Sequence, residues 1–171
     1  MNRATNAIGR CISCSVFIYP LFCIKIKFEE INNKWIDRVG VEDVLAIIIT
    51  NNPQVKEEYG DKYQIELIEG TYLEVLYSAR DKVHEGHRLL THPLSGSVKP
   101  NETPYKSLII SKEKQSLHMD SLMIIEDSIG TAQKFMNTKM PRQWNDEILR
   151  DFMEIDFRLI SSGIESMRQF C

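Results

Sequence analysis

Apolar runs alternate with amphipathic segments from residue 42 onward. Residues 44–50, VLAIIIT, form a continuous apolar run rich in isoleucine, which is typical of a strand buried on both faces. Residues 63–68, YQIELI, alternate between apolar and polar positions and predict a second strand. Shorter apolar segments at 88–91 and at 108–111, the latter preceded by Ser107, predict a third and a fourth strand.

Two helices are expected between the first three strands. Asn52 is a suitable N-cap and Pro53 suits a first helical turn, so a short helix is predicted over residues 53–59. A second helix is predicted to begin at the T-x-x-E capping box formed by Thr71 and Glu74. Its core-facing stripe is expected to be Tyr72, Leu76, Ala79 and Val83.

Two further helices are expected after the fourth strand. Asp120 is the expected N-cap of the third helix and Asn145 that of the fourth. The stripes predicted to face the core are Leu122, Ile125, Ile129, Ala132 and Met136 in the third helix, and Ile148, Phe152, Ile155 and Leu159 in the fourth.

The order of these elements predicts an α/β fold. We expect a small three-layer sandwich, with a mostly parallel sheet of about four strands and helices on both faces. The direction of the fourth strand stays open, because the connection before it is long enough for either direction. We assign a single domain to residues 42–163 and a frayed tail to residues 164–171.

Residues 1–41 do not share the pattern of the rest of the chain. They contain the uncharged run CISCSVFIYPLFCI, which is shorter than the roughly 20 residues of an ordinary membrane-spanning helix. The pair Cys11 and Cys14 has C-x-x-C spacing but lacks the second pair that a zinc site needs. Two interpretations stay open: a disordered extension, or a start codon assigned too early, with the native start near Val39 or Val41.

The charge and the cysteine distribution exclude some classes of partner. The formal net charge is -3, which gives no electrostatic reason to expect nucleic-acid binding. The four cysteines lie in the first 23 residues and at the last position, so the body of the chain has no disulfide framework. We therefore expect a cytoplasmic protein that binds neither nucleic acid nor a membrane.

A long polar loop, residues 91–106, is the strongest candidate for a binding site. It contains three prolines and follows the predicted third strand, at the carboxyl edge of the sheet where ligands of α/β folds bind. The TNNP turn after the first strand is expected at the same edge. The alternative is a rigid structural cover held by local hydrogen bonds. The candidate ligand-binding residues are Thr50, Asn51, Asn52, Thr91, His92, Ser95, Gly96, Ser97, Lys99, Asn101, Thr103 and Lys106.

Catalytic residues are harder to assign. Ser-Gly-Ser followed by a lysine is able to form an anion-binding concavity, but Ser95 lacks the G-x-S-x-G elbow of a nucleophile. His92 is the best single candidate for an acid–base residue, and a plain loop histidine is the alternative. His84 and His87 are separated by Gly86 and have no visible third ligand, so we expect neither a metal nor a cofactor.

Four segments of the chain resemble a known family. They are IITNNPQVKEEY, IELIEGTYLEVL, ARDKVHEGHRLLTHPLSGSVKPNETPYKSLIIS and DSLMIIEDSI, and together they resemble the GrdX family over about residues 46–136, extending toward residue 160. These small proteins are encoded with the glycine, sarcosine and betaine reductase systems of anaerobic amino-acid-fermenting bacteria, which include selenoproteins. The resemblance implies an accessory role and reductase components as partners, without implying a reaction.

Three hypotheses follow. The first is a non-catalytic accessory protein of such a reductase system, which contacts a partner or a small anion through the polar loop. The second is a small enzyme acting on an anionic or phosphorylated metabolite, with His92 as acid–base and Lys99 or Lys106 holding the anion. The third is a homodimer formed through the last helix, where methionines and phenylalanines accumulate: Phe135, Met136, Met140, Phe152, Met153 and Phe157.

Overall fold

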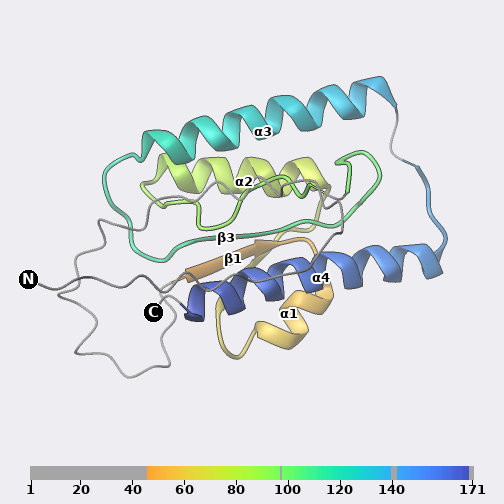
Figure 1. The fold of residues 1–171 in the computed structure, drawn as a ribbon, viewed down its shortest axis with the longest axis horizontal. Coiled ribbons are helices and arrows are strands. Elements are labelled where there is room, and N and C mark those ends of the chain that lie inside the picture. The colour runs from red at the N-terminus through yellow and green to blue at the C-terminus, as the bar shows by residue number, and fades with distance from the viewer. Residues whose placement is uncertain (1–45, 97, 140–141, 170–171) are drawn as a thin grey trace, which may run out of the picture. The chain divides into compact units, whose positions relative to one another are not determined.

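A computed structural model describes residues 46–96, 98–139 and 142–169 of the chain (Figure 1). In chain order the described elements are β1 (Ala46–Thr50), α1 (Pro53–Tyr59), β2 (Gln64–Leu67), α2 (Tyr72–His84), β3 (Ser107–Ser111), α3 (Met119–Thr138) and α4 (Asp146–Gln169). The interpretations of residues 1–41, the start of the domain at residue 42, and the candidate residues Ser97 and Met140 lie outside the described residues.

The sheet in the described part of the chain is three-stranded and mixed, with the order β2-β1-β3. The central strand β1 is parallel to β2, with Ile48 opposite Ile65, and antiparallel to β3, with Thr50 opposite Ser107. The prediction of a mostly parallel sheet of about four strands was therefore wrong. The direction of the predicted fourth strand, which the sequence left open, is antiparallel to the central strand.

The predicted third strand, residues 88–91, forms an isolated bridge between Leu89 and Ile110. The segment still runs beside β3, but its hydrogen bonds are irregular. The main-chain N–H groups of Leu90 and Thr91 both donate to the Ile109 carbonyl oxygen. The Thr91 hydroxyl accepts from the Ile109 N–H at 2.9 Å, in the place of the backbone carbonyl that a regular ladder would use.

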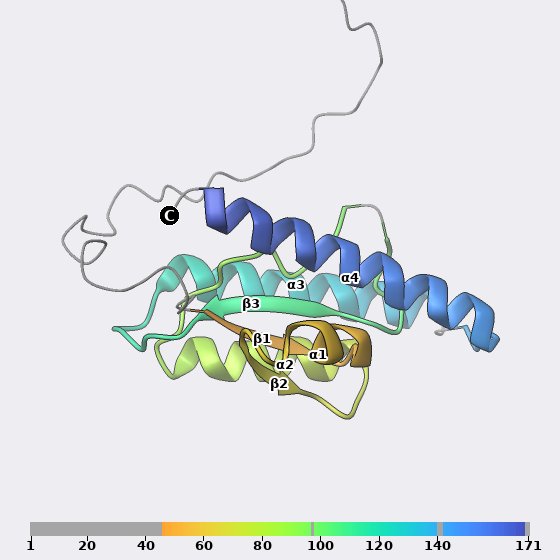
Figure 2. The same ribbon diagram turned by 90° about the horizontal axis from the view of Figure 1, so that it is seen from below.

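Helices cover both faces of the sheet, which confirms the three-layer arrangement. In Figure 1, α2 and α3 lie above the strands, while α1 and α4 lie below them; Figure 2 shows α1 and α4 on their common side. Because side chains alternate along a strand, β1 contributes to two cores. One core contains Ile47, Ile49, Leu108 and Ile110 with residues of α2 and α3. The other contains Ile48, Ile109, Val55, Ile160 and Ile164.

Local signals placed the first two helices correctly. Asn52 caps α1 by accepting a hydrogen bond from the Gln54 N–H at 3.0 Å, and the helix has the predicted bounds. The capping box of Thr71 and Glu74 begins α2, and all four residues of its predicted stripe are buried. The helix α3 begins one residue before the expected cap Asp120, because the His118 ring accepts from the Ser121 N–H and serves as the cap.

The predicted orientation of α4 was partly wrong. Asn145 caps the helix as expected, but Ile155 and Leu159, predicted to face the core, are 41% and 43% exposed. Asp156, Ile160 and Ile164 are buried instead. The helix is turned so that the Asp156 carboxylate reaches the sheet edge. It also continues past Gly163, where fraying was expected, to Gln169, because Ile164 packs in the core.

No helix in the described residues combines the length and the apolar character needed to cross a membrane.

Replacing Ile164 by alanine is expected to lower the free energy of unfolding by about 2–4 kcal/mol, because truncation of a buried isoleucine leaves a cavity. Ile155→Ala, on the exposed side of the same helix, is the matched control and is expected to cost less than about 1 kcal/mol. Urea titrations followed by circular dichroism measure both values. Equal losses would contradict the orientation of α4.

Candidate functional site

Two polar segments, the TNNP turn after β1 and the polar loop, meet at one edge of the sheet. The parallel strands β1 and β2 both end there, and the antiparallel strand β3 begins there. The polar loop leads directly into β3, so its last residue, Lys106, arrives beside Thr50 and Asn51. This convergence is the one that the sequence predicted, although it arises through an antiparallel strand.

Asn51 fastens the end of the polar loop to this edge. Its side-chain amide donates to the carbonyl oxygens of Gly70 at 3.0 Å and Pro104 at 2.8 Å. Its side-chain oxygen accepts from the Lys106 N–H at 2.7 Å. A single side chain therefore joins the first strand, the turn before α2 and the loop. Asn51 acts as a structural residue.

Asp156 of α4 is buried at the centre of the same edge. Its carboxylate accepts hydrogen bonds from the Ser107 N–H at 2.9 Å, the Ser107 hydroxyl at 2.7 Å and the Asn52 amide at 3.0 Å. The Thr50 hydroxyl extends the network by accepting from the Asn52 N–H at 2.9 Å and lying 2.7 Å from the Ser107 hydroxyl. Three donors compensate the buried negative charge.

The prediction from sequence missed Asp156. A signal was present, since Phe152, Asp156, Ile160 and Ile164 recur at the four-residue spacing of one helix face. A carboxylate on an otherwise apolar face indicates a buried, hydrogen-bonded group.

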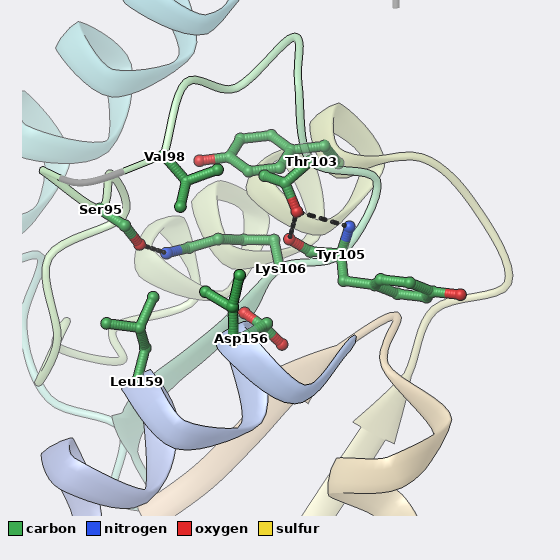
Figure 3. A pocket seen from close by; sticks show the side chains of 9 residues that line it. Ser95, Val98, Thr103, Tyr105, Lys106, Asp156 and Leu159 are labelled. Carbon is green, nitrogen blue, oxygen red and sulfur yellow. Dashed lines mark hydrogen bonds between the residues drawn. The ribbon is translucent and has the colours of Figure 1, made fainter. Parts of the chain in front are cut away.

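A small pocket lies between the polar loop and α4 (Figure 3). It opens to solvent, and in this conformation its interior has room for about one water molecule. Figure 3 shows the Lys106 side chain extending across it toward Ser95, with Asp156 and Leu159 on the α4 side. The lining residues are Tyr72, Ser95, Val98, Thr103, Tyr105, Lys106, Ile155, Asp156 and Leu159.

Lys106 is the most unusual group in this pocket. Its side chain is buried, with 5% exposed, and its ammonium donates to the Ser95 hydroxyl at 3.1 Å. Among the described residues, the ammonium has no other hydrogen-bond partner, and no carboxylate lies within salt-bridge distance of it. Burial lowers the pKa of Lys106 to about 8, and the negative charge of Asp156 opposes that shift.

Tyr72 contributes a second perturbed group to the pocket. Burial raises the pKa of its hydroxyl, and the nearby charge of Asp156 acts in the same direction. The hydroxyl therefore keeps its proton at neutral pH and donates to the Pro93 carbonyl oxygen over a long 3.4 Å contact. Tyr72 was expected from the sequence to be a core residue, and its tip reaches the pocket.

Three other predicted residues of the loop, His92, Gly96 and Lys99, do not gather around Lys106. His92 is exposed, and its Nδ1 accepts from the Leu94 N–H at 3.1 Å within a local turn. Lys99 is 62% exposed, and its ammonium lies 4.0 Å from the Glu102 carboxylate. A Cβ at Gly96 would meet open space, so the fold does not require glycine there. Neither His92 nor Lys99 lines the pocket.

Several of the remaining candidates hold the loop in place. Thr91 binds Ile109 as described above, and the buried amide of Asn101 donates to the Lys139 carbonyl oxygen at 3.4 Å. The Thr103 hydroxyl accepts from the Tyr105 N–H at 3.3 Å and also lines the pocket. Much of the loop therefore fits the alternative of a rigid structural cover held by hydrogen bonds. Ser95 and Lys106 differ from these residues, because they bind each other and line the pocket.

The histidines before the loop have separate environments. His84 is exposed, while the His87 Nδ1 lies 2.7 Å from the Ser111 carbonyl oxygen. Within residues 46–96, 98–139 and 142–169, no three His, Cys, Asp or Glu side chains are grouped as metal ligands.

Comparison with known proteins identifies a family. The profile of the GrdX-like protein family matches residues 47–165. Neither a curated protein nor a solved structure matches the chain.

Asp156→Asn is expected to lower the free energy of unfolding by about 2–4 kcal/mol, because an amide N–H₂ would face donors that now bind a carboxylate oxygen. The matched control is Asp151→Asn, an exposed aspartate of the same helix, which is expected to change stability by less than about 0.5 kcal/mol. Chemical denaturation measures both. If Asp156→Asn lowers the free energy of unfolding no more than Asp151→Asn does, the hydrogen bonds of Asp156 do not stabilise the fold.

Lys106→Met is expected to stabilise the chain at pH 7 by about 1–3 kcal/mol, because burial disfavours the ammonium in the folded state. The pKa of Lys106 is lowered from 10.5 to about 8. The free-energy penalty of burying the ammonium therefore has its full size below pH 8 and declines as the pH rises to 10.5. The difference between the two proteins should therefore shrink across that interval. Thermal unfolding at several pH values measures it, with the exposed Lys99→Met as the control that shows no such trend.

Proposed function

The chain belongs to the GrdX-like protein family, and from this membership together with the pocket at Lys106 we propose that it is an accessory protein of a glycine, sarcosine or betaine reductase-type system, working in the cytoplasm. In this role it binds an anionic group at the end of the polar loop. The group belongs either to a small molecule or to an acidic side chain or chain end of a partner.

The buried ammonium of Lys106 is the observation that carries this proposal. A cation that is withdrawn from water needs compensating hydrogen bonds or an opposite charge. Lys106 has three N–H donors, and within the described residues one of them is used, on Ser95. An anionic oxygen in the pocket would accept hydrogen bonds from the other two N–H groups. Binding would therefore stabilise the buried ammonium, which lowers the stability of the free protein.

The position of Asp156 limits what the pocket accepts. The Asp156 carboxylate also lines the pocket. The three groups that donate hydrogen bonds to it weaken its electric field, but the negative charge remains. A ligand with two or more negative charges would therefore be repelled more strongly than a singly charged one. We propose a monoanionic group, such as a carboxylate.

The alternative of an enzyme with His92 as acid–base has less support. His92 does not line the pocket, and its Nδ1 is engaged in a local turn. Lys99, the other predicted anion-binding residue, is exposed beside Glu102.

The proposal predicts a response to anions that depends on Lys106. At pH 7, acetate is expected to raise the melting temperature of the wild-type chain, and affinity-tagged chain is expected to recover reductase components from the cells that produce it. Both responses should disappear in Lys106→Met and persist in Lys99→Met. Because the pKa of Lys106 is about 8, acetate affinity should fall about tenfold per pH unit above that value.

The melting experiment with acetate and the recovery experiment distinguish a small-molecule ligand from a partner protein as the source of the anionic group. Stabilisation by acetate without recovery of reductase components supports a small-molecule ligand, and recovery that acetate suppresses supports a partner. If neither response occurs, or if both survive in Lys106→Met, the proposed site is wrong.

A further inference from the structure

The fold pairs a serine with a buried lysine, although neither residue belongs to a recognisable sequence motif. Ser95 lies in the polar loop and Lys106 at its end, and the Ser95 Oγ lies 3.1 Å from the Lys106 Nζ. Ser95 is half-buried at the wall of the pocket, while the lysine is enclosed behind it (Figure 3). A hydroxyl is thereby presented to the pocket with an amine within proton-transfer distance.

We propose that Ser95 and Lys106 form a serine–lysine dyad that accepts short acyl groups from esters or thioesters, with Ser95 as nucleophile and Lys106 as general base. This inference goes beyond the proposed function and does not require a reductase partner. It uses the uncharged amine of Lys106, whereas anion binding uses the ammonium.

The reaction balances without an oxidant or a cofactor. The neutral amine of Lys106 takes the hydroxyl proton of Ser95 while Oγ bonds to the carbonyl carbon of the substrate. The bond from that carbon to the leaving oxygen or sulfur breaks, and the leaving group receives the proton from Lys106. Water then attacks the acyl-serine, gives a proton to Lys106 and releases a carboxylic acid. Oγ regains that proton, which restores the dyad.

The surroundings of the dyad suit this chemistry. Burial lowers the pKa of Lys106 to about 8, so about a tenth of the molecules carry the neutral amine at pH 7. The hydroxyl of Tyr72 keeps its proton and lines the same pocket, where it is a candidate donor to the oxyanion. The carboxylic acid product would give its proton to the neutral Lys106 and leave as a carboxylate, and the ammonium would then lose that proton to solvent. A carboxylate beside the Lys106 ammonium is also the arrangement that the proposed function requires.

The pocket also limits the acyl group. Val98, Ile155 and Leu159 supply apolar walls, and the interior has room for about one water molecule. An acetyl group, with three heavy atoms, already exceeds this space, so it enters only if the loop shifts, and longer acyl chains would require a larger shift. We therefore infer specificity for short, uncharged acyl groups. The other titratable side chains that line the pocket near the lysine are Tyr72 from α2 and Asp156 from α4, while the Tyr105 ring points away from it (Figure 3).

The test is intact-protein mass spectrometry of the full chain after reaction with p-nitrophenyl acetate, followed by peptide mapping. The expected result is one acetyl group on Ser95, and at least a tenfold slower reaction in Ser95→Ala. Ser116→Ala, which removes an exposed serine outside the pocket, is the matched control and should react like the wild type. Ser95→Cys keeps a nucleophile and should still form an adduct, which separates lost chemistry from lost folding.

Lys106→Arg distinguishes this inference from the proposed function. An arginine keeps the positive charge and cannot act as a base near neutral pH, so acylation should fall at least tenfold while stabilisation by acetate remains. In the wild type, the acylation rate should rise about tenfold per pH unit up to pH 8 and then level off, opposite to the trend of anion binding. Acylation that survives Ser95→Ala or Lys106→Arg would overturn the dyad, and so would the absence at pH 9 of both an adduct and any release of p-nitrophenol above that of Ser95→Ala.

Discussion

The hydrogen bonds of Asp156 are the interaction on which the rest of this structure depends. The carboxylate binds the first residue of β3 through both the main chain and the side chain of Ser107, and it binds Asn52 after β1. A buried carboxylate tolerates little displacement from its donors, since an unsatisfied charge costs several kcal/mol. The polar contact of Asp156 and the burial of Ile160 and Ile164, which share its helix face, therefore fix the same rotation of α4 about its axis.

This rotation shapes the pocket. With Asp156 directed at the sheet edge, Ile160 and Ile164 enter the core and Ile155 and Leu159 turn outward beside the polar loop. The same network holds Ser107, and Asn51 binds the main chain of Lys106 next to it. The lysine side chain is thus positioned by two constraints on the neighbouring backbone, and it extends toward Ser95 between α4 and the loop.

The polar loop combines two kinds of residue that the sequence does not distinguish. Thr91 and Asn101 bind main-chain groups and serve the fold. Ser95 and Lys106 bind one another and face a pocket, at a cost in stability that the hydrophobic core has to offset. Such locally unfavourable burial is commonly retained at functional sites, which is why we propose that these two residues carry the chemistry of the loop.

The sequence by itself determined the features that depend on neighbours along the chain. The caps of α1 and α2, the buried strand β1, the inward stripe of α2 and the placement of helices on both faces follow from spacing within a few residues. The tertiary structure decided the pairs that are distant along the chain. Ser107 and Asp156 are 49 residues apart and Asn52 and Asp156 are 104 apart. It also decided that residues 88–91 form an isolated bridge, because the Thr91 hydroxyl replaces a main-chain partner. Spacing within a few residues does not reveal such partners, since these contacts form when whole elements pack. The Ser95–Lys106 pair, 11 residues apart, likewise depends on how the polar loop folds back on itself.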